Sequence, residues 1–163
     1  MGRMEALTKQ LRLSAPAQTR ALCERLASLL RPGDFIGLSG DLGAGKTFLS
    51  RSLCESLGVP KRQIASPTFS IVHPYEGGRL PVQHADLYRI GDYDELHATG
   101  FLDLVGGPSV LLVEWIDRVP EAAPPEWLHI EMRHVGPRTR VAVLTGHGRR
   151  GRELVEALKD LSR

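Results

Sequence analysis

Apolar residues recur at helical spacing in three stretches of the chain. From Ala15 to Leu30 they form a stripe at Ala17, Ala21, Leu22, Leu26, Leu29 and Leu30. From Lys46 to Leu57 the apolar positions Phe48, Leu49, Leu53 and Leu57 are predicted to face inward, and Gly58 is predicted to end the helix. Gly151 to Leu161 predicts a short amphipathic helix at the C-terminus.

Short apolar or alternating runs between these stretches predict strands. They are Phe35 to Leu38, Thr68 to His73, Leu80 to Leu87, Val110 to Val113, Trp127 to Met132 and Arg140 to Leu144. The turn-rich residues 74–79 predict a β-hairpin between the second and third of these runs. Asp92 is predicted to cap a helix that runs to about Thr99, and a further helical piece is predicted over 101–105. This order predicts an α/β fold with a largely parallel sheet, flanked by helices, and antiparallel strands added at an edge.

The length and composition are those of one globular domain over residues 1–163. The formal net charge of +2 is too small to indicate a nucleic-acid partner by itself. No apolar run is long enough to cross a bilayer, and Met1 to Gln10 lacks the apolar region of a signal peptide. The two cysteines, Cys23 and Cys54, have no metal spacing and are predicted to be reduced core thiols. Together these features favour a cytoplasmic protein that does not associate with membranes.

The clearest chemical motif is the loop Gly40-Asp41-Leu42-Gly43-Ala44-Gly45-Lys46-Thr47, which matches G-x-x-x-x-G-K-[ST] at every fixed position. Glycines let the backbone wrap a phosphate group, and the loop amides and the following helix N-terminus attract the anion. Lys46 is expected to reach the β- and γ-phosphates and the Thr47 hydroxyl to bind Mg²⁺. A glycine turn with an incidental lysine is the alternative, but the loop follows a predicted buried strand and opens a predicted helix. The loop therefore predicts a nucleoside triphosphate site, with ATP and Mg²⁺ as its ligands.

Two carboxylates lie at the ends of predicted strands, where such folds hold Mg²⁺ directly or through water. Glu114 ends the run 110–113 and is the favoured metal ligand. Asp86 follows 82–85 and is favoured for the attacking water or for sensing the γ-phosphate. Either could instead be a strand-end carboxylate that faces solvent. Ser66-Pro67-Thr68 occupies the place of a nucleotide switch, although a simple proline-held turn explains it equally well.

The chain resembles the TsaE (YjeE) family, the P-loop ATPases of bacterial tRNA threonylcarbamoyladenosine biosynthesis. The resemblance rests on the phosphate loop together with Ser66-Pro67-Thr68-Phe69, His84-Ala85-Asp86-Leu87-Tyr88-Arg89 and Val113-Glu114-Trp115, which occur in the family's order. It implies an α/β, P-loop NTPase-like three-layer fold and slow ATP hydrolysis. It also implies a role as accessory to the TsaD-TsaB pair, which transfers the threonylcarbamoyl group to tRNA, with tRNA contacted indirectly or weakly.

The resemblance also implies roles for individual residues. Thr47 and Glu114 are similar to the family's Mg²⁺ ligands, Asp86 to its catalytic carboxylate and Thr68 to a switch position. Trp115 is similar to a residue near the nucleotide, and Arg140, or Arg138, to an arginine near the last strands. Catalytic roles are thus expected for Lys46, Thr68 and Asp86. The acidic residues that the family carries near its first helix are absent from 14–19, which leaves contacts to the base from this stretch unassigned.

Two other functions remain compatible with the phosphate loop. A small-molecule kinase of the P-loop fold would need a substrate site and an arginine-bearing lid, for which Arg89 and the pair Arg149-Arg150 are the only substitutes. A GTPase-like switch usually reads guanine through an asparagine-containing motif, and this chain contains no asparagine.

Overall fold

The computed structural model describes residues 5–41, 43–64, 71–158 and 161. The strands are β1 (Leu7–Leu13), β2 (Phe35–Ser39), β3 (Val72–Tyr75), β4 (Val82–Asp86), β5 (Val110–Glu114), β6 (Trp127–His134) and β7 (Arg140–His147). The α-helices are α1 (Pro16–Leu29), α2 (Lys46–Ser56), α3 (Tyr93–Ala98) and α4 (Gly148–Leu158). Short 3-10 helices are η1 (Lys61–Gln63), η2 (Phe101–Leu104), η3 (Ile116–Arg118) and η4 (Pro120–Ala122).

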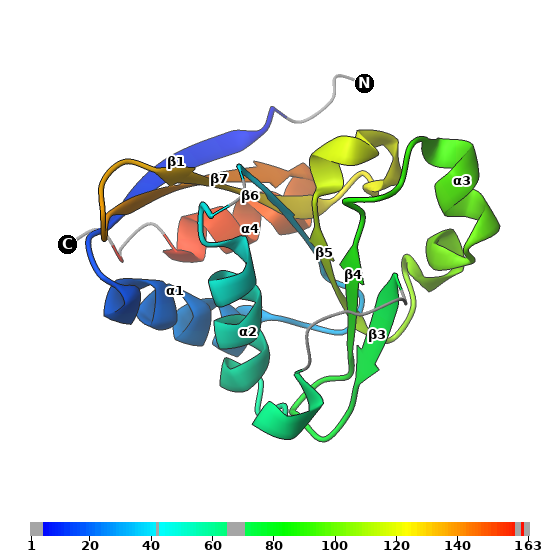
Figure 1. The fold of residues 1–163 in the computed structure, drawn as a ribbon, viewed down its shortest axis with the longest axis horizontal. Helices are drawn as coiled ribbons and strands as arrows, with labels where there is room; N and C mark the ends of the chain where they lie inside the picture. Colours follow the sequence, from blue (N-terminus) through cyan, green and yellow to red (C-terminus); the bar gives the residue numbers. More distant parts are fainter. Residues whose placement is uncertain (1–4, 42, 65–70, 159–160, 162–163) are drawn as a thin grey trace.

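Seven strands form one sheet in the order β1-β7-β6-β2-β5-β4-β3 (Figure 1). The four central strands β6, β2, β5 and β4 run parallel to one another. β7 and β1 extend the sheet antiparallel on one side, and β3 does so on the other. The prediction of antiparallel strands at the edges is confirmed. The predicted parallel strands form the centre of the sheet, and the sheet as a whole is mixed, because three of the six strand pairings in this order are antiparallel.

One of the antiparallel edge strands, β1, was not predicted in the sequence analysis. Its burial pattern alternates, with Leu11 and Leu13 buried and Arg12 exposed between them. This period of two is a strand signal, but only two of its residues are deeply buried. β1 pairs with β7 along its whole length, from Leu7 opposite Gly146 to Leu13 opposite Arg140.

The two faces of the sheet are covered differently. Helices α1, α2 and α4 lie together on one side (Figure 1) and share a large apolar cluster with strand residues such as Ile36 and Leu112. On the other face a smaller cluster joins Phe35 and Val113 to α3, η2, η3 and η4. Alternate residues of β2 and β5 thus enter different clusters, as the pleat of a strand buried on both faces requires.

The predicted number of α-helices is confirmed, but some bounds and some buried positions differ from the prediction. α1 buries Thr19, Leu22, Cys23, Leu26 and Ala27, whereas Ala17 and Ala21, which were assigned to the apolar stripe, are exposed. Their small side chains carry little information about which face of a helix is buried. α4 begins three residues earlier than predicted. The Asp92 cap of α3 is confirmed, because its carboxylate accepts a hydrogen bond from the Glu95 backbone N–H at 2.8 Å.

Cys23 on α1 and Cys54 on α2 are buried free thiols, as expected. Burial raises the pKa of each thiol to about 12, so neither is a reactive thiolate near neutral pH. Among the described residues, no helix is both long enough and apolar enough to span a bilayer.

Candidate functional site

The glycine-rich loop joins the end of β2 to the start of α2, as the motif requires. Gly40, Gly43 and Gly45 have φ values of 132°, 80° and 106°, in the range that disfavours side chains. A Cβ added at Gly40 would collide with the carbonyl oxygen of Met132 on β6, so a glycine is needed there on two grounds. A Cβ added at Gly43 would meet no described atom within 4 Å, so its positive φ is what favours glycine there. Leu42 lies outside the described residues.

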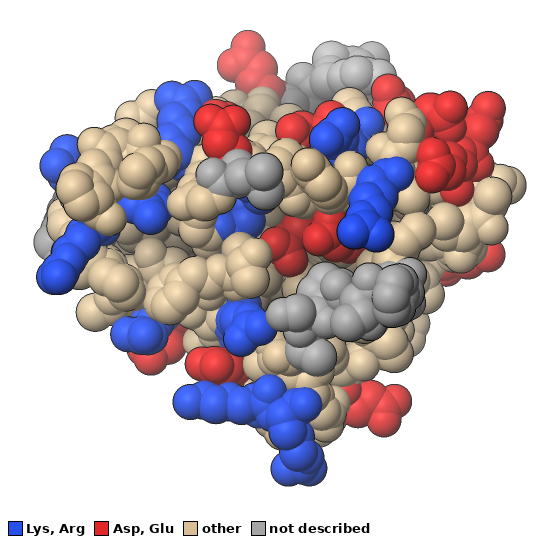
Figure 2. Space-filling view, in the orientation of Figure 1, with Lys and Arg blue, Asp and Glu red and all other residues tan. Residues whose placement is uncertain are grey.

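A cavity of about 360 Å³ lies beside this loop. Its lining joins the loop and α2 to the ends of β4 and β5 through Gly43, Gly45, Lys46, Thr47, Phe48, Asp86, Tyr88, Glu114 and Trp115. The carboxyl ends of the parallel strands β2, β5 and β4 meet at this edge, the position where open α/β sheets bind ligands. Figure 2 shows acidic side chains near the centre of the displayed face and lysine and arginine side chains around them. The structure thus brings together seven of the residues predicted for the site: Gly43, Gly45, Lys46, Thr47, Asp86, Glu114 and Trp115.

Lys46 is the buried cation of the site, with 6% of its surface exposed. Its ammonium donates to the backbone oxygens of Gly40 and of Asp41, the latter at 2.8 Å, and lies 4.0 Å from the centroid of the Trp115 ring. Burial lowers the pKa of Lys46, while the carboxylates of Glu114, Asp117, Asp41 and Asp86 act in the opposite direction. The lysine therefore lies in a setting that favours contact with further negative charge, such as a phosphate group.

Glu114 is a buried carboxylate, 5% exposed, at the end of β5. Its Oε2 lies 2.5 Å from Nε2 of His84 on β4, and Nδ1 of the same imidazole lies 3.1 Å from the hydroxyl of Tyr75 on β3. Burial raises the pKa of Tyr75, which keeps its hydroxyl protonated. In the sequence, His84 is part of the family motif without a role assigned to it. Its contact with Glu114 indicates that it orients this carboxylate.

Asp86 is directly opposite Glu114 in the β4–β5 register but has different surroundings. It is partly exposed, and its Oδ1 accepts a hydrogen bond from the Tyr88 backbone N–H at 2.9 Å. This bond fixes the carboxylate at the cavity wall through the loop that follows β4, and leaves it open to water.

Trp115 has an unusual backbone conformation, with φ of 62° and ψ of 38°, directly after Glu114. A left-handed conformation is costly for a residue with a large side chain and marks a position held by its surroundings. Here the indole packs against Tyr88 at 4.8 Å between ring centroids, and the Arg118 guanidinium lies 5.0 Å from the Tyr88 ring. The turn presents the indole to the cavity and beneath Lys46.

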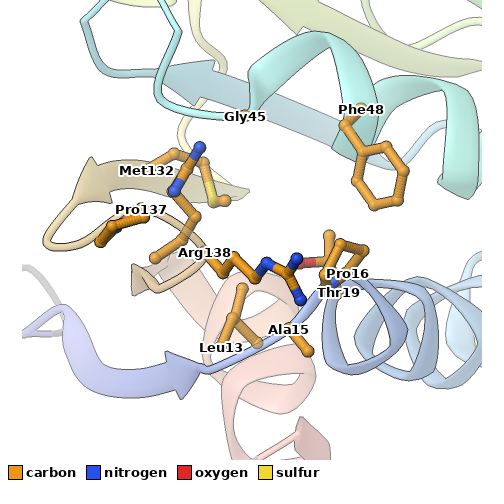
Figure 3. Close-up of a pocket in the computed structure, with 10 residues that line it drawn as sticks. Leu13, Ala15, Pro16, Thr19, Gly45, Phe48, Met132, Pro137 and Arg138 are labelled. Atoms are coloured by element: carbon orange, nitrogen blue, oxygen red, sulfur yellow. The ribbon is translucent and has the colours of Figure 1, made fainter.

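A second cavity, of about 390 Å³, adjoins the first through Gly45 and Phe48 (Figure 3). Its other lining residues come from the β1–α1 junction and from β6, β7 and the loop between them: Leu13, Ala15, Pro16, Thr19, Met132, Pro137, Arg138 and Arg140. Both arginines considered from the sequence therefore lie here. Arg140 also donates to the backbone oxygens of Gly136 and Thr139, both at 3.2 Å, which holds the β6–β7 loop in place.

The structure changes the interpretation of Phe48. It was predicted to face the core with Leu49 and Leu53, which are buried, but it is partly exposed and lines both cavities. The Arg20 guanidinium lies 5.1 Å from its ring centroid. Sequence reasoning also missed Met132 as a lining residue and left residues 14–19 without a role, because nothing local marks residues that meet only after β1, β6 and β7 have paired. The switch prediction for Ser66 and Thr68 lies outside the described residues.

Comparison with known proteins gives one consistent result. The family model described as "Threonylcarbamoyl adenosine biosynthesis protein TsaE" matches residues 13–142. A tRNA threonylcarbamoyladenosine biosynthesis protein TsaE of Bacillus subtilis is 39% identical over 143 residues, which is 88% of this chain and 89% of that protein. The protein with the same name in Streptomyces coelicolor is 44% identical over 138 residues, 80% of this chain and 92% of its own. The crystal structure of YdiB from Bacillus subtilis superimposes with a TM-score of 0.80 at 32% identity, covering 98% of this chain and 99% of that one.

Proposed function

Because the chain belongs to the TsaE family of threonylcarbamoyl adenosine biosynthesis proteins, we propose that it is a slow, Mg²⁺-dependent ATPase that supports threonylcarbamoyladenosine formation on tRNA. We place this activity in the cytoplasm, with the TsaD-TsaB pair as protein partners and tRNA as an indirect one. The observation that carries the proposal is the single cavity in which Lys46, Thr47, Asp86 and Glu114 meet beside the glycine loop. A P-loop NTPase-like three-layer arrangement fits the two apolar clusters on opposite faces of the sheet.

The donor atoms at this cavity suit magnesium. The Thr47 hydroxyl and the Glu114 carboxylate supply oxygen, the ligand type that Mg²⁺ prefers, and a nucleotide would supply the phosphate oxygens. No group of three or more His, Cys, Asp or Glu residues able to hold a metal occurs in the described part of the chain. Bound Mg²⁺ would neutralise charge on the β- and γ-phosphate oxygens.

The chain's own residues account for the remaining requirements of hydrolysis. The loop amides and the N-terminus of α2 would hold the β-phosphate, and Lys46 would exchange its bonds to Gly40 and Asp41 for phosphate oxygens. Asp86, at the wall of the same cavity and open to water, would orient the attacking water and accept its proton. Glu114, which is held away from solvent, would bind the metal ion through its carboxylate.

The second cavity fits the nucleoside. It continues the phosphate cavity past Gly45, has largely apolar walls with polar groups at few points, and lies within the usual size range of ligand sites. Pro16, Phe48 and Met132 offer apolar surface for a base, and Arg138 and Arg140 offer donors. The β1–α1 junction lines this cavity although residues 14–19 lack the family's acidic residues.

The test combines calorimetry with reconstitution. Wild-type protein should bind ATP in the presence of Mg²⁺, and Lys46→Ala should weaken that binding, whereas Lys61→Ala on the exposed η1 should not. ATP hydrolysis should be slow alone and should change when purified TsaD and TsaB are added. Unchanged affinity in Lys46→Ala would refute the phosphate-loop assignment. Failure to associate with TsaD-TsaB in a pull-down, with and without ATP, would favour a small-molecule kinase instead.

A further inference from the structure

We infer that His84 and Tyr75 are positioning residues that hold Glu114 in the orientation needed to bind the metal ion. The inference rests on the proposed function, since it assigns Glu114 to Mg²⁺. The observation behind it is a continuous chain of three buried polar side chains on three adjacent strands, which ends at the cavity.

The sheet register explains how these side chains meet. Tyr75 is paired with Val82, two residues before His84, and His84 is paired with Leu112, two residues before Glu114. Each contact is therefore a diagonal one between neighbouring strands, on the face that α2 covers. The three hydrogen-bonded side chains therefore run diagonally across the sheet, from β3 through β4 to the end of β5. Sequence separation hides this arrangement, because the partners are 9 and 30 positions apart in the chain.

The donors and acceptors along this series of hydrogen bonds follow from the chemistry of its side chains. A carboxylate only accepts hydrogen bonds, so His84 donates from Nε2 to Glu114 Oε2. A Tyr75 hydroxyl that donates to Nδ1 matches the Nε2–H form of the imidazole, the form that directs Nε2–H to Glu114. Tyr75, His84 and Glu114 are 3%, 6% and 5% exposed, so water does not compete strongly for these bonds. With Oε2 held by His84, the glutamate has little freedom to turn away from the cavity.

Packing alone is a poor explanation of this arrangement. The registered neighbours Val82 and Leu112 are 1% exposed and apolar, and an apolar residue at position 84 would suit them well. Burying an imidazole and a phenol instead is favourable only where each polar atom has a partner, as it has along this chain. Hydrogen bonds to metal ligands from outside the coordination sphere typically alter metal affinity by about 10–100-fold when removed.

The experiment measures the metal directly. Mn²⁺ is titrated into protein saturated with a non-hydrolysable ATP analogue, and free Mn²⁺ is followed by electron paramagnetic resonance. His84→Leu should weaken Mn²⁺ binding by about 10–100-fold, and Tyr75→Phe by about 2- to 10-fold, since one neutral hydrogen bond is lost. His84→Gln, whose amide N–H can replace Nε2–H, should recover affinity to within about threefold of wild type. His147→Gln, far along the sheet at the end of β7, is the matched control and should bind Mn²⁺ as wild type does.

A second titration separates this inference from the proposed function. Nucleotide affinity in EDTA should be the same in all variants, because the hydrogen bonds act on the metal ligand and not on the phosphate loop. Wild-type Mn²⁺ affinity in both His84→Leu and Tyr75→Phe would overturn the inference while leaving the ATPase proposal intact. Equal loss in His84→Leu and His84→Gln would assign the histidine to packing and also overturn it. A wild-type protein that binds neither nucleotide nor Mn²⁺ would instead refute the proposed function.

Discussion

Asp86 and Glu114 occupy equivalent places in neighbouring strands but differ in what surrounds them. They face each other in the β4–β5 register and line the same cavity. Glu114 is buried and hydrogen-bonded to His84, whereas Asp86 is partly exposed and bonded to the backbone N–H of Tyr88. Two carboxylates at one site can therefore have separate tasks, because environment, rather than residue type, decides which is buried against a histidine and which stays accessible to water.

The largest expected effect separates the two carboxylates through turnover. Asp86→Asn should lower kcat of ATP hydrolysis by about 10³-fold, within the usual range for losing a general base, with little change in ATP affinity. A phosphate-release assay gives kcat, and calorimetry gives the affinity. Asp94→Asn, an exposed carboxylate on α3, is the control. Normal turnover in Asp86→Asn would contradict the assignment of different roles to Asp86 and Glu114.

Glu114→Gln should act on the metal instead. We expect the gain in ATP affinity that Mg²⁺ provides to fall by about 10- to 100-fold, because a charged oxygen ligand becomes a neutral amide. Calorimetry with Mg²⁺ and then with EDTA measures that gain, and Glu131→Gln on β6 is the control for a lost surface charge. An equal loss of affinity in EDTA would show that Glu114 acts on the phosphate loop and not on the metal.

Replacing Trp115 tests the contribution of its contact with Lys46, the cation that lies near both carboxylates. The Lys46 ammonium lies 4.0 Å from the indole centroid, a contact that contributes about 0.5–2 kcal/mol in proteins. Trp115→Phe should lower ATP affinity by about 2- to 10-fold without abolishing hydrolysis. Trp115 fluorescence should also change on ATP binding in the Trp127→Phe variant. A fluorescence change that persists in Trp115→Phe would assign the signal to Trp127 and contradict this account of Lys46.

The smallest effect concerns histidines on the opposite face of the sheet from His84. Burial lowers the pKa of His129, whose Nε2 lies 2.7 Å from Ser39 Oγ, and that of His147, which stacks on Trp127. The unfolded chain therefore binds more protons than the folded one as pH falls below about 6.5, so acid should destabilise the fold. We expect the melting temperature to drop by a few degrees between pH 7.5 and 5.5, and the drop to be smaller in His129→Gln.

The matched control for that measurement is His134→Gln, an exposed histidine at the end of β6. It should keep the wild-type pH dependence. A melting temperature that rises on acidification, or the same drop in His129→Gln as in wild type, would contradict the assignment of acid sensitivity to these buried rings.

The phosphate loop and the two carboxylates could be predicted from the sequence because their signals are local. Gly40, Gly43 and Gly45 answer a backbone requirement within one loop, and Lys46 follows from the same motif. Asp86 and Glu114 each end an apolar run, and parallel strands place such ends at one edge of the sheet. The resemblance to one family then narrowed a phosphate site to a proposed ATPase of tRNA modification, and the comparisons confirm the family.

Only the tertiary structure decided how these residues are supported. The strand order, with β3 beside β4 and β1 beside β7, creates the chain from Tyr75 to Glu114 and closes the second cavity against Gly45. Neither arrangement has a local signal, because each depends on residues that are far apart in sequence and meet through strand pairing and register. The sequence by itself therefore predicted which groups would contact a phosphate, whereas the fold determined which carboxylate is buried, which is partly exposed and what holds each in place.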